Sequence, residues 1–321
     1  MLFRKARSGL RLVSMHLERN AKSMSLNKRQ FDVLVCVEPK LNAVSAVELA
    51  GEVGIAKPLV EETLTELTQE GLICDGLITD AGRTALEPYR VKRAVFMAAG
   101  FGSRMVPVTL NTPKPLVRVK GKRIIDSLLD AVIAAGIEEI YLVRGYLAEQ
   151  FDQLLKKYPQ IIFIENPIYN ETNNISSAYF ARHLLANSYV FEADLVLYNP
   201  KLITKYQYNS NYLGVPTDRT EDWCFDVDGD GVIRKLMIGG TDCYHMYGLS
   251  YWTEEDGKRL GEHLEQVFRE VPGGKERYWD QVIFDYHLED YCVHVRPCTF
   301  SDIVEIDTFN ELKLIDPTYA V

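Results

Sequence analysis

The sequence predicts an α/β protein in which a doubly wound domain, with a mixed, mostly parallel sheet, follows a small helical domain. From Arg93 onward, short apolar runs alternate with helical periodicity, a pattern typical of a sheet covered by helices on both faces. Residues 26–92 instead show helical periodicity with one hairpin signal. The predicted segments are therefore 1–25, a basic tail, 26–92, the small domain, and 93–321, the large domain.

The composition is that of an ordinary globular protein. The chain has 321 residues, comfortable for two domains, and 47% of them are hydrophobic. No window reaches the roughly 18 apolar residues that a membrane span needs, so no span is predicted. The six cysteines are scattered and form no CxxC pair. This pattern favours reduced thiols in a cytoplasmic protein over disulfides or a zinc site.

The net charge of −9 is unevenly distributed. Residues 1–30 hold eight Lys or Arg and one Glu, whereas residues 31–92 hold five basic and eleven acidic residues. The large domain is also acidic, which argues against a nucleic-acid template because phosphate contacts dominate such binding. Small phosphate ligands remain compatible, since local cations and loop amides hold them.

The basic tail, residues 1–25, is rich in Arg and Ser and is predicted to be disordered. It lacks the continuous apolar region of a secretory signal. Two other interpretations stay open: the tail is faintly similar to a transit peptide, or translation starts at Met24.

The small domain resembles a winged helix-turn-helix. Three helices are expected, with apolar faces at Phe31, Val33, Leu34 and Val37, at Val47, Leu49 and Ala50, and at Leu59, Leu64 and Leu67. Residues 72–79 are expected to form two short strands around an Asp75-Gly76 turn, followed by a helix that Thr79 or Asp80 caps.

The expected recognition helix of this domain, residues 57–69, contains Glu61, Glu62 and Glu66 but only one cation, Lys57. An acidic helix is a poor ligand for DNA. The sequence therefore favours docking, or a homodimer formed through this domain, over nucleic-acid binding.

The large domain is expected to alternate strands and helices in chain order. Strands are predicted at 94–97, 140–143, 161–164 and 189–191, and helices at 124–135, 147–155 and 176–185. After Asn199 the strands look more antiparallel and the loops longer, where substrate specificity is usually added.

A glycine-containing loop follows the first of these strands. It consists of Ala98, Ala99, Gly100, Phe101, Gly102, Ser103 and Arg104, and Lys114 follows between two prolines. Small residues let the backbone approach a ligand, and successive N–H groups can bind an anion. Arg104 has a planar fork suited to a triphosphate, and Lys114 adds a point charge. The spacing is not the G-x-G-x-x-G of dinucleotide-binding proteins.

Carboxylates follow two other predicted strands. Asp194 comes after the strand 189–191, and ligands of doubly wound sheets collect at such carboxyl ends. Glu305 and Asp307 alternate on one face of a later strand end. Mg²⁺ takes one or two carboxylates plus phosphate oxygens, so a magnesium site is predicted here. For either position alone, a helix N-cap is the plain alternative.

These motifs resemble the signature of nucleotidyltransferases that make nucleoside-diphosphate sugars and alcohols. Gly145-Tyr146-Leu147, Asn173-Asn174 with Ser177, Tyr278-Trp279-Asp280 and Glu305-Ile306-Asp307 sharpen the resemblance to bacterial CTP:phosphocholine cytidylyltransferases. It covers essentially all of 93–321 and none of the small domain. It implies the doubly wound nucleotidyltransferase fold, with CTP and phosphocholine as substrates and pyrophosphate released.

The resemblance and the residue chemistry together give the expected site. Arg104 and Lys114 are catalytic, and Asp194 and Asp307 bind Mg²⁺ with Glu305 as an accessory. The expected nucleotide-binding residues are Ala98, Ala99, Gly100, Phe101, Gly102, Ser103, Tyr146, Asn173, Asn174 and Ser177. A quaternary ammonium is recognised by aromatic faces and a nearby carboxylate. Trp223, Tyr278, Trp279 and Asp280 are therefore expected around the amine, unless these rings fill the core instead.

Other functions stay open at this point. Phosphoethanolamine or 2-aminoethylphosphonate could replace phosphocholine, because the expected cage could accept a primary amine. A sugar-1-phosphate nucleotidyltransferase is a second hypothesis, although no compact cluster of Asn, Gln, Glu and Thr follows Asp194. A nucleotide-sensing, DNA-binding regulator is the third, and it would have no need of metal-binding carboxylates.

Overall fold

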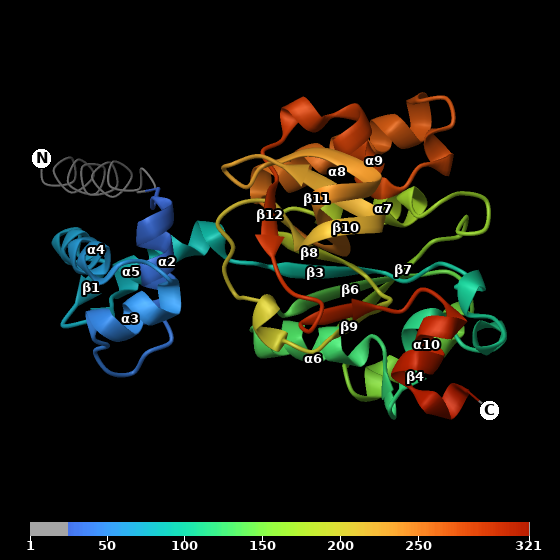
Figure 1. Ribbon diagram of the computed structural model, residues 1–321, viewed down its shortest axis with the longest axis horizontal. Helices are drawn as coiled ribbons and strands as arrows, with labels where there is room; N and C mark the ends of the chain where they lie inside the picture. The colour runs from blue at the N-terminus through green and yellow to red at the C-terminus, as the bar shows by residue number, and fades with distance from the viewer. Residues whose placement is uncertain (1–24, 321) are drawn as a thin grey trace, which may run out of the picture. The chain divides into compact units, whose positions relative to one another are not determined.

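The computed structural model describes residues 25–320 and divides into two compact units, with the division after Arg90 (Figure 1). All but one residue of the predicted basic tail, 1–25, lies outside the described residues. None of the helices in the described part is long and apolar enough to cross a membrane.

The described part of the first unit, from residue 25 onward, contains four α-helices and a two-stranded hairpin. In chain order these are α2 (Lys28–Val37), α3 (Ala46–Val53), α4 (Lys57–Gln69), β1 (Ile73–Cys74), β2 (Leu77–Ile78) and α5 (Asp80–Leu86). At the turn, Asp75 and Gly76 have φ of 51° and 74°. A type I′ hairpin needs positive φ at both central residues, so the predicted hairpin is confirmed.

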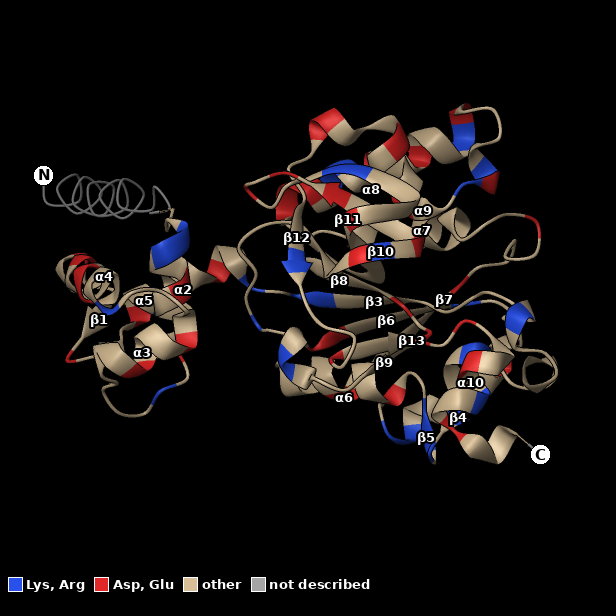
Figure 2. Cartoon of the chain, viewed as in Figure 1, with Lys and Arg blue, Asp and Glu red and all other residues tan. Residues whose placement is uncertain are grey.

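The third helix of this unit, α4, buries only part of the apolar face that the sequence predicts. Val60, Thr63 and Leu67 are buried, whereas Leu59 is 42% exposed. Its outer surface is acidic (Figure 2), and its only Lys, Lys57, pairs with Glu61 at 2.7 Å. The surface of α4 therefore carries little free positive charge for a phosphate backbone.

A seven-stranded sheet forms the centre of the second unit. Its strands, in spatial order, are β12 (His294–Pro297), β10 (Asn211–Val227), β11 (Ile233–Trp252), β8 (Ser188–Glu192), β3 (Arg93–Met97), β6 (Glu139–Arg144) and β7 (Ile161–Glu165). β3 pairs in parallel with β6 and β8, while β11 runs antiparallel to β8 and β10. The predicted mixed, mostly parallel sheet is confirmed.

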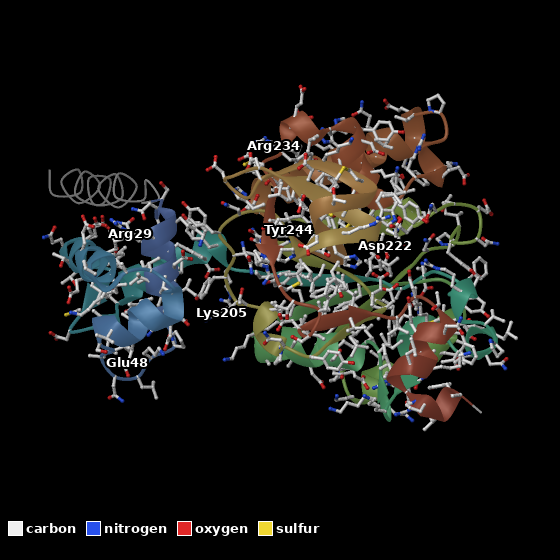
Figure 3. The ribbon with its side chains drawn as sticks, viewed as in Figure 1. Arg29, Glu48, Lys205, Asp222, Arg234 and Tyr244 are labelled. Carbon is white, nitrogen blue, oxygen red and sulfur yellow. The ribbon has the colours of Figure 1, made fainter. Side chains whose placement is uncertain are left out.

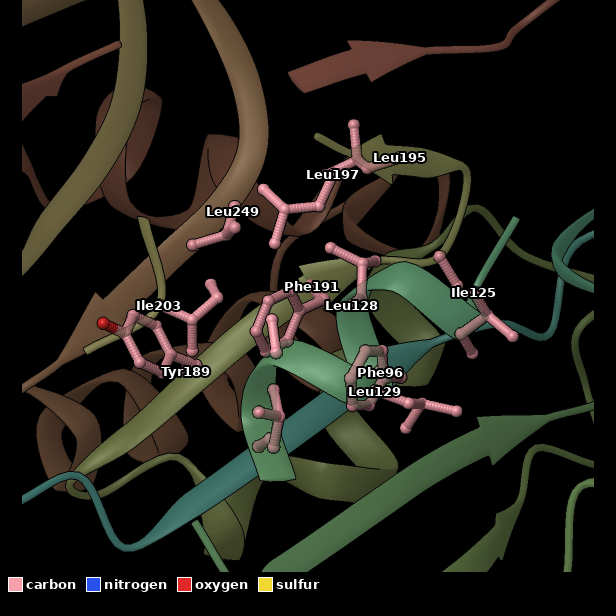
Figure 4. Packing of buried hydrophobic residues seen from close by; sticks show 14 of the residues in the cluster. Phe96, Ile125, Leu128, Leu129, Tyr189, Phe191, Leu195, Leu197, Ile203 and Leu249 are labelled. Atoms are coloured by element: carbon pink, nitrogen blue, oxygen red, sulfur yellow. The ribbon is translucent and has the colours of Figure 1, made fainter. Parts of the chain in front are cut away.

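Helices cover both faces of this sheet because its central strand is apolar on both sides. Ala94 and Phe96 of β3 join the core that contains Leu128 of α6 (Asp126–Ala134), shown in Figure 4. Val95 and Met97 face the other core, with α7 (Ile175–Ala181) and α8 (Glu254–Glu270). Alternate residues of a strand point to opposite faces, so a continuous apolar run requires cover on both.

The smaller elements of the unit bring distant segments to one edge of the sheet. They are β4 (Arg118–Val119), β5 (Lys122–Arg123), the 3₁₀ segment Ala148–Lys156, β9 (Leu195–Leu197), α9 (Trp279–Gln281), the π-helical segment Val282–Tyr286, β13 (Ile303–Glu305) and α10 (Phe309–Ile315). β13 pairs antiparallel with β9, and Glu305 lies opposite Leu195. This pairing places residues 305–307 beside Asp194, just beyond the carboxyl end of β8.

Candidate active site

A cleft of ≈ 550 Å³ lies where β3 and β8 end. Its lining contains nearly every residue predicted for the nucleotide, the cations and the metal: residues 98–104, Lys114, Asn173, Asn174, Ser177, Asp194, Glu305 and Asp307. Tyr146 is not among the described residues that line it. The Tyr146 hydroxyl donates to the Thr109 carbonyl at 3.0 Å, and its ring packs against Phe101 with centroids 5.2 Å apart. Tyr146 therefore packs against the glycine-containing loop without lining the cleft.

Two cations pair with carboxylates of this cleft, and one of them, Lys114, bridges two carboxylates. Lys114 Nζ donates to Asp194 Oδ2 and to Asp307 Oδ1, both at 2.8 Å. Arg104 Nη1 lies 2.7 Å from Asp307 Oδ2. Burial alone would lower the pKa of Lys114, but the two carboxylates hold that pKa above its ordinary value. The lysine is therefore a fixed positive charge at the centre of the cleft.

Gly102 makes room for this lysine. Its φ is +61°, and a Cβ at this position would lie 3.0 Å from the Lys114 Cβ and 3.1 Å from the Thr109 Cγ2. Both the left-handed backbone and the close approach favour glycine. The loop sequence thus determines where the Lys114 side chain can pass.

The acidic residues fit a hard divalent cation. Carboxylate oxygens of Glu192, Asp194 and Glu305 all lie within 4.8 Å of one another. Asp194 Oδ1 is buried and has no hydrogen-bond partner among the described residues. A buried oxygen without a partner is costly unless an ion or water binds it, and Mg²⁺ prefers carboxylate oxygens. The donor set therefore fits the Mg²⁺ that the sequence predicts.

The electrostatics of this cluster lead to the same interpretation. Burial, reinforced by Asp194, raises the pKa of both Glu192 and Glu305 well above the ordinary value. Crowded carboxylates repel one another, and a bound cation would relieve that repulsion. Asp307 differs from the carboxylates of this cluster, because Arg104 and Lys114 already pair with its two oxygens.

Glu192 was not among the predicted site residues. It precedes Asp194 by two positions at the end of β8, the same spacing that singled out Glu305 and Asp307. That spacing was the available signal, because residues two apart at a strand end share a face.

A smaller cavity of ≈ 120 Å³, here called the side pocket, adjoins the cleft. The cleft and the side pocket share Arg104, Glu192, Tyr278, Glu305 and Asp307. The rest of the side-pocket lining is Asp222, Trp223, Met246, Gly248 and Asp280. Asp222, labelled in Figure 3, and Trp223 lie on β10. The pocket is thus strongly acidic, with two aromatic rings in its wall.

Three of the four residues predicted for the amine line this side pocket. The rings of Trp223 and Tyr278 meet edge to face, with centroids 5.6 Å apart at 66°. Asp280 is 5% exposed, and burial raises its pKa to about 6.

The fourth residue, Trp279, lies elsewhere, which corrects the predicted cage. Trp279 is 1% exposed and packs in the core against Tyr212 and Trp252, with centroids 6.0 and 6.3 Å away. It is not among the described residues that line either cavity. The alternative that such a ring fills the core therefore holds for Trp279.

The side chains of Asn173 and Asn174 are engaged within the protein. Asn173 Nδ2 donates to the Glu276 carbonyl at 3.2 Å, and its Oδ1 accepts from the Asn174 N–H. Asn174 Nδ2 donates to Glu192 Oε1 at 3.1 Å, and its Oδ1 accepts from the Trp279 N–H. Both residues line the cleft, but their side chains also hold neighbouring segments of the protein together through these hydrogen bonds. The sequence did not predict this structural role.

A second group of metal-ligand residue types lies outside the cleft. His263 and His287 stack with centroids 3.6 Å apart at 9°, and Asp290 Oδ2 lies 3.3 Å from His287 Nδ1. Imidazole lone pairs lie in the ring plane, so two nearly parallel rings do not aim at one ion. This group is better explained as a packed, hydrogen-bonded cluster.

Comparisons with known proteins agree with this geometry. The nucleotidyl transferase family model matches residues 93–210. The chain is 38% identical, over 230 residues, to a 2-aminoethylphosphonate cytidylyltransferase of Lancefieldella rimae. The aligned region covers 71% of this chain and 93% of that protein. It is 29% identical to the choline-phosphate cytidylyltransferase of Streptococcus pneumoniae, over 70% of this chain and 96% of that one.

A solved structure is similar over the same share of the chain. The CTP:phosphocholine cytidylyltransferase from Streptococcus pneumoniae superimposes with a TM-score of 0.66 at 29% identity, covering 71% of this chain and 99% of that one. The fold, the composition of the cleft and these comparisons agree: the chain belongs to the nucleotidyl transferase family, and the relatives described above are cytidylyltransferases.

Proposed function

We propose that the protein transfers the cytidylyl group of CTP to a small phosphonate or phosphate that carries a primary amine, and that pyrophosphate is released. The preferred acceptor in this proposal is 2-aminoethylphosphonate, and Mg²⁺ is the cofactor. The side pocket carries the proposal, because it places an acidic recess directly beside the cleft that would hold the triphosphate.

The lining of the side pocket favours an amine over a sugar. Among the described residues that line it, five are Asp or Glu and none is Asn, Gln, Ser or Thr. Sugar hydroxyls both donate and accept hydrogen bonds, whereas ionised carboxylates only accept. A cationic group matches this lining, since it supplies donors and opposite charge together.

Two features favour a primary over a quaternary ammonium. A primary ammonium donates three hydrogen bonds, which Glu192 and Asp280 can accept. A quaternary ammonium relies on aromatic faces, and the burial of Trp279 leaves Trp223 and Tyr278 as the rings of the side pocket in the described residues. The relative that acts on 2-aminoethylphosphonate, at 38% identity, supports this choice. Phosphocholine is the second candidate because those two rings remain.

The chemistry proposed is an in-line attack of an acceptor oxygen on the α-phosphorus of CTP. The attacking oxygen belongs to a phosphonate or phosphate group that is already anionic at neutral pH, so no protein base is required to deprotonate it. The obstacle is repulsion between two polyanions. Arg104 and the loop amides of residues 98–104 would hold the triphosphate, and Lys114 would attract the attacking oxygen.

Asp194, Glu305 and Asp307 would hold Mg²⁺, which supplies charge neutralisation at the reacting phosphates. Lys114 and Arg104 pair with two of these carboxylates, those of Asp194 and Asp307. They are therefore already oriented toward the position where phosphate oxygens arrive.

A pyrophosphate-release screen tests the proposed function. Four nucleoside triphosphates are each combined with 2-aminoethylphosphonate, phosphoethanolamine, phosphocholine and glucose-1-phosphate. CTP with 2-aminoethylphosphonate is expected to give the highest kcat/KM. Higher turnover with the sugar phosphate would replace the amine hypothesis with the sugar hypothesis.

Replacing Trp223 by Ala tests the aromatic wall of the side pocket. KM for the amine acceptor is expected to rise up to ~30-fold, because a desolvated cation–π contact contributes about 2 kcal/mol. KM for CTP is expected to change little. Asp280→Asn, which removes the charge opposite the ammonium, is the second arm of the experiment. If Trp223→Ala instead weakens both substrates alike and lowers the Tm, Trp223 is a packing residue.

A further inference from the structure

Two of the five carboxylates that line the side pocket, Glu192 and Asp280, approach it from different elements. Glu192 stands at the end of β8, and Asp280 belongs to the short helix α9. Each carboxylate receives a hydrogen bond from one polar side chain. The Tyr212 hydroxyl donates to Asp280 Oδ1 at 2.6 Å, and Asn174 Nδ2 donates to Glu192 Oε1 at 3.1 Å.

Tyr212 is placed to orient Asp280 without touching a ligand. Tyr212 lies on β10 and is 0% exposed. The centroid of its ring lies 5.4–5.8 Å from the ring centroids of Phe225, Phe284 and Trp252. Burial and the neighbouring carboxylate raise the pKa of Tyr212, so its hydroxyl stays protonated and remains a donor. A rigid donor on one oxygen fixes the rotation of the Asp280 carboxylate.

Asn174 links the two sides of the side pocket. While its Nδ2 holds Glu192, its Oδ1 accepts the backbone N–H of Trp279 at 2.9 Å. Trp279 directly precedes Asp280, so a single amide group ties the end of β8 to the helix that carries the second carboxylate. The spacing between Glu192 and Asp280 therefore depends on this side chain.

Gly248 of β11 leaves space for the Glu192 carboxylate in this arrangement. A Cβ at Gly248 would lie 2.6 Å from Glu192 Cγ and 2.7 Å from its Oε2. Real Cβ atoms do not approach so closely, so a larger residue would push Glu192 out of place. The pocket is thus built around a defined position of this side chain.

We propose that Tyr212 and Asn174 are positioning residues that hold Asp280 and Glu192 as a pair of hydrogen-bond acceptors for a primary ammonium. This pair then sets the preference for a primary over a quaternary amine. The inference rests on the proposed function. Mg²⁺ needs only one or two carboxylates. Asp194, whose Oδ1 has no partner among the described residues, and Glu305 supply two, so Glu192 can accept a hydrogen bond from the amine.

Steady-state kinetics of Tyr212→Phe provide the test, because this change removes one hydroxyl and keeps the ring. KM for 2-aminoethylphosphonate is expected to rise at least about 10-fold, the usual effect of a lost hydrogen bond to a charged group. KM for CTP and kcat are expected to stay near wild type. The preference for 2-aminoethylphosphonate over phosphocholine should fall, because a trimethylammonium has no N–H to donate.

Tyr251→Phe is the matched control. Tyr251 is also buried in the sheet, at 1% exposed, but its hydroxyl lies 3.4 Å from Asn187 Oδ1. It should leave both acceptor KM values and their ratio unchanged. Asn174→Ala is the second variant, and it is expected to lower the same preference by releasing Glu192. If Tyr212→Phe does not fold, the acceptor preference of Asn174→Ala alone tests the proposed positioning roles.

The outcomes separate this inference from the function on which it rests. If the wild-type protein turns over none of the amine acceptors, the proposed function is wrong. If the wild type prefers 2-aminoethylphosphonate while both variants keep that preference, the positioning roles are wrong and the proposed function stands. Equal losses for CTP and for both acceptors would also overturn the positioning roles.

Discussion

Replacing Asp194 by Asn is expected to reduce cytidylyl transfer to less than a tenth of the wild-type rate while the protein stays folded. Asparagine keeps the shape of the side chain but removes the charge that would hold Mg²⁺ and that pairs with Lys114 at 2.8 Å. The rate should be measured as pyrophosphate release under saturating Mg²⁺, and the fold by circular dichroism and Tm. More than a tenth of the wild-type activity would contradict the metal assignment.

Asp152→Asn is a matched control for this experiment. Asp152 belongs to the segment Ala148–Lys156, its side chain is 63% exposed, and it pairs with Arg144 at 2.6 Å. It lies outside the residues that line the cleft or the side pocket in the described part of the chain. The same chemical change at this position should therefore leave the rate near wild type.

The sequence predicted the central sheet and much of the cleft lining because both depend largely on local patterns. Two-sided apolar runs such as β3 identify buried parallel strands wherever they occur. The loop after β3 and Asp194 after β8 lie at strand ends, which doubly wound sheets bring to one edge. Glu305 belongs to β13, which pairs with β9 outside that sheet, so the family resemblance and not the strand pattern placed it with Asp194 and Lys114.

The side pocket could not be predicted to the same depth, because its geometry depends on contacts between distant segments. The Tyr212–Asp280 bond joins residues 68 positions apart, and the Asn174–Trp279 bond joins residues 105 apart. Trp279 and Trp223 both stand beside charged residues in the sequence, yet the first is buried and the second lines the side pocket. Only the packing of α9 against β10 distinguishes them, and no local pattern encodes it.

The small unit shows the same limit. Its hairpin follows from the Asp75-Gly76 dipeptide, which favours positive φ at both positions. The inward face of α4 was harder to predict, because Leu59 and Val60 are adjacent apolar residues that point in different directions. Helical periodicity predicts how wide an apolar face is. When two apolar residues are adjacent in the sequence, it does not show which of them points into the core. A role in dimer formation or docking stays a prediction for this unit.

Replacing Lys114 by Ala is expected to lower kcat/KM by ~10²-fold or more, the size of other single electrostatic contributions to such reactions. Lys114 is the buried cation between Asp194 and Asp307, where the proposed reaction needs a positive charge to attract the attacking oxygen. Lys114→Met should lose nearly as much activity, because it keeps the aliphatic stem but not the charge. Lys122→Ala, at an exposed position of β5, is the control and should stay near wild type.

Removing this charge should also change how the protein responds to Mg²⁺. Without Lys114, Asp194 loses its cation and Asp307 keeps only Arg104. The carboxylates of the cleft then repel one another more strongly, and like charges in a buried site destabilise the fold. Added Mg²⁺ should therefore raise the Tm of Lys114→Met by more than it raises the Tm of the wild type. An unchanged kcat/KM together with an equal Mg²⁺ shift would mean that this lysine serves neither the reaction nor the charge balance of the cleft.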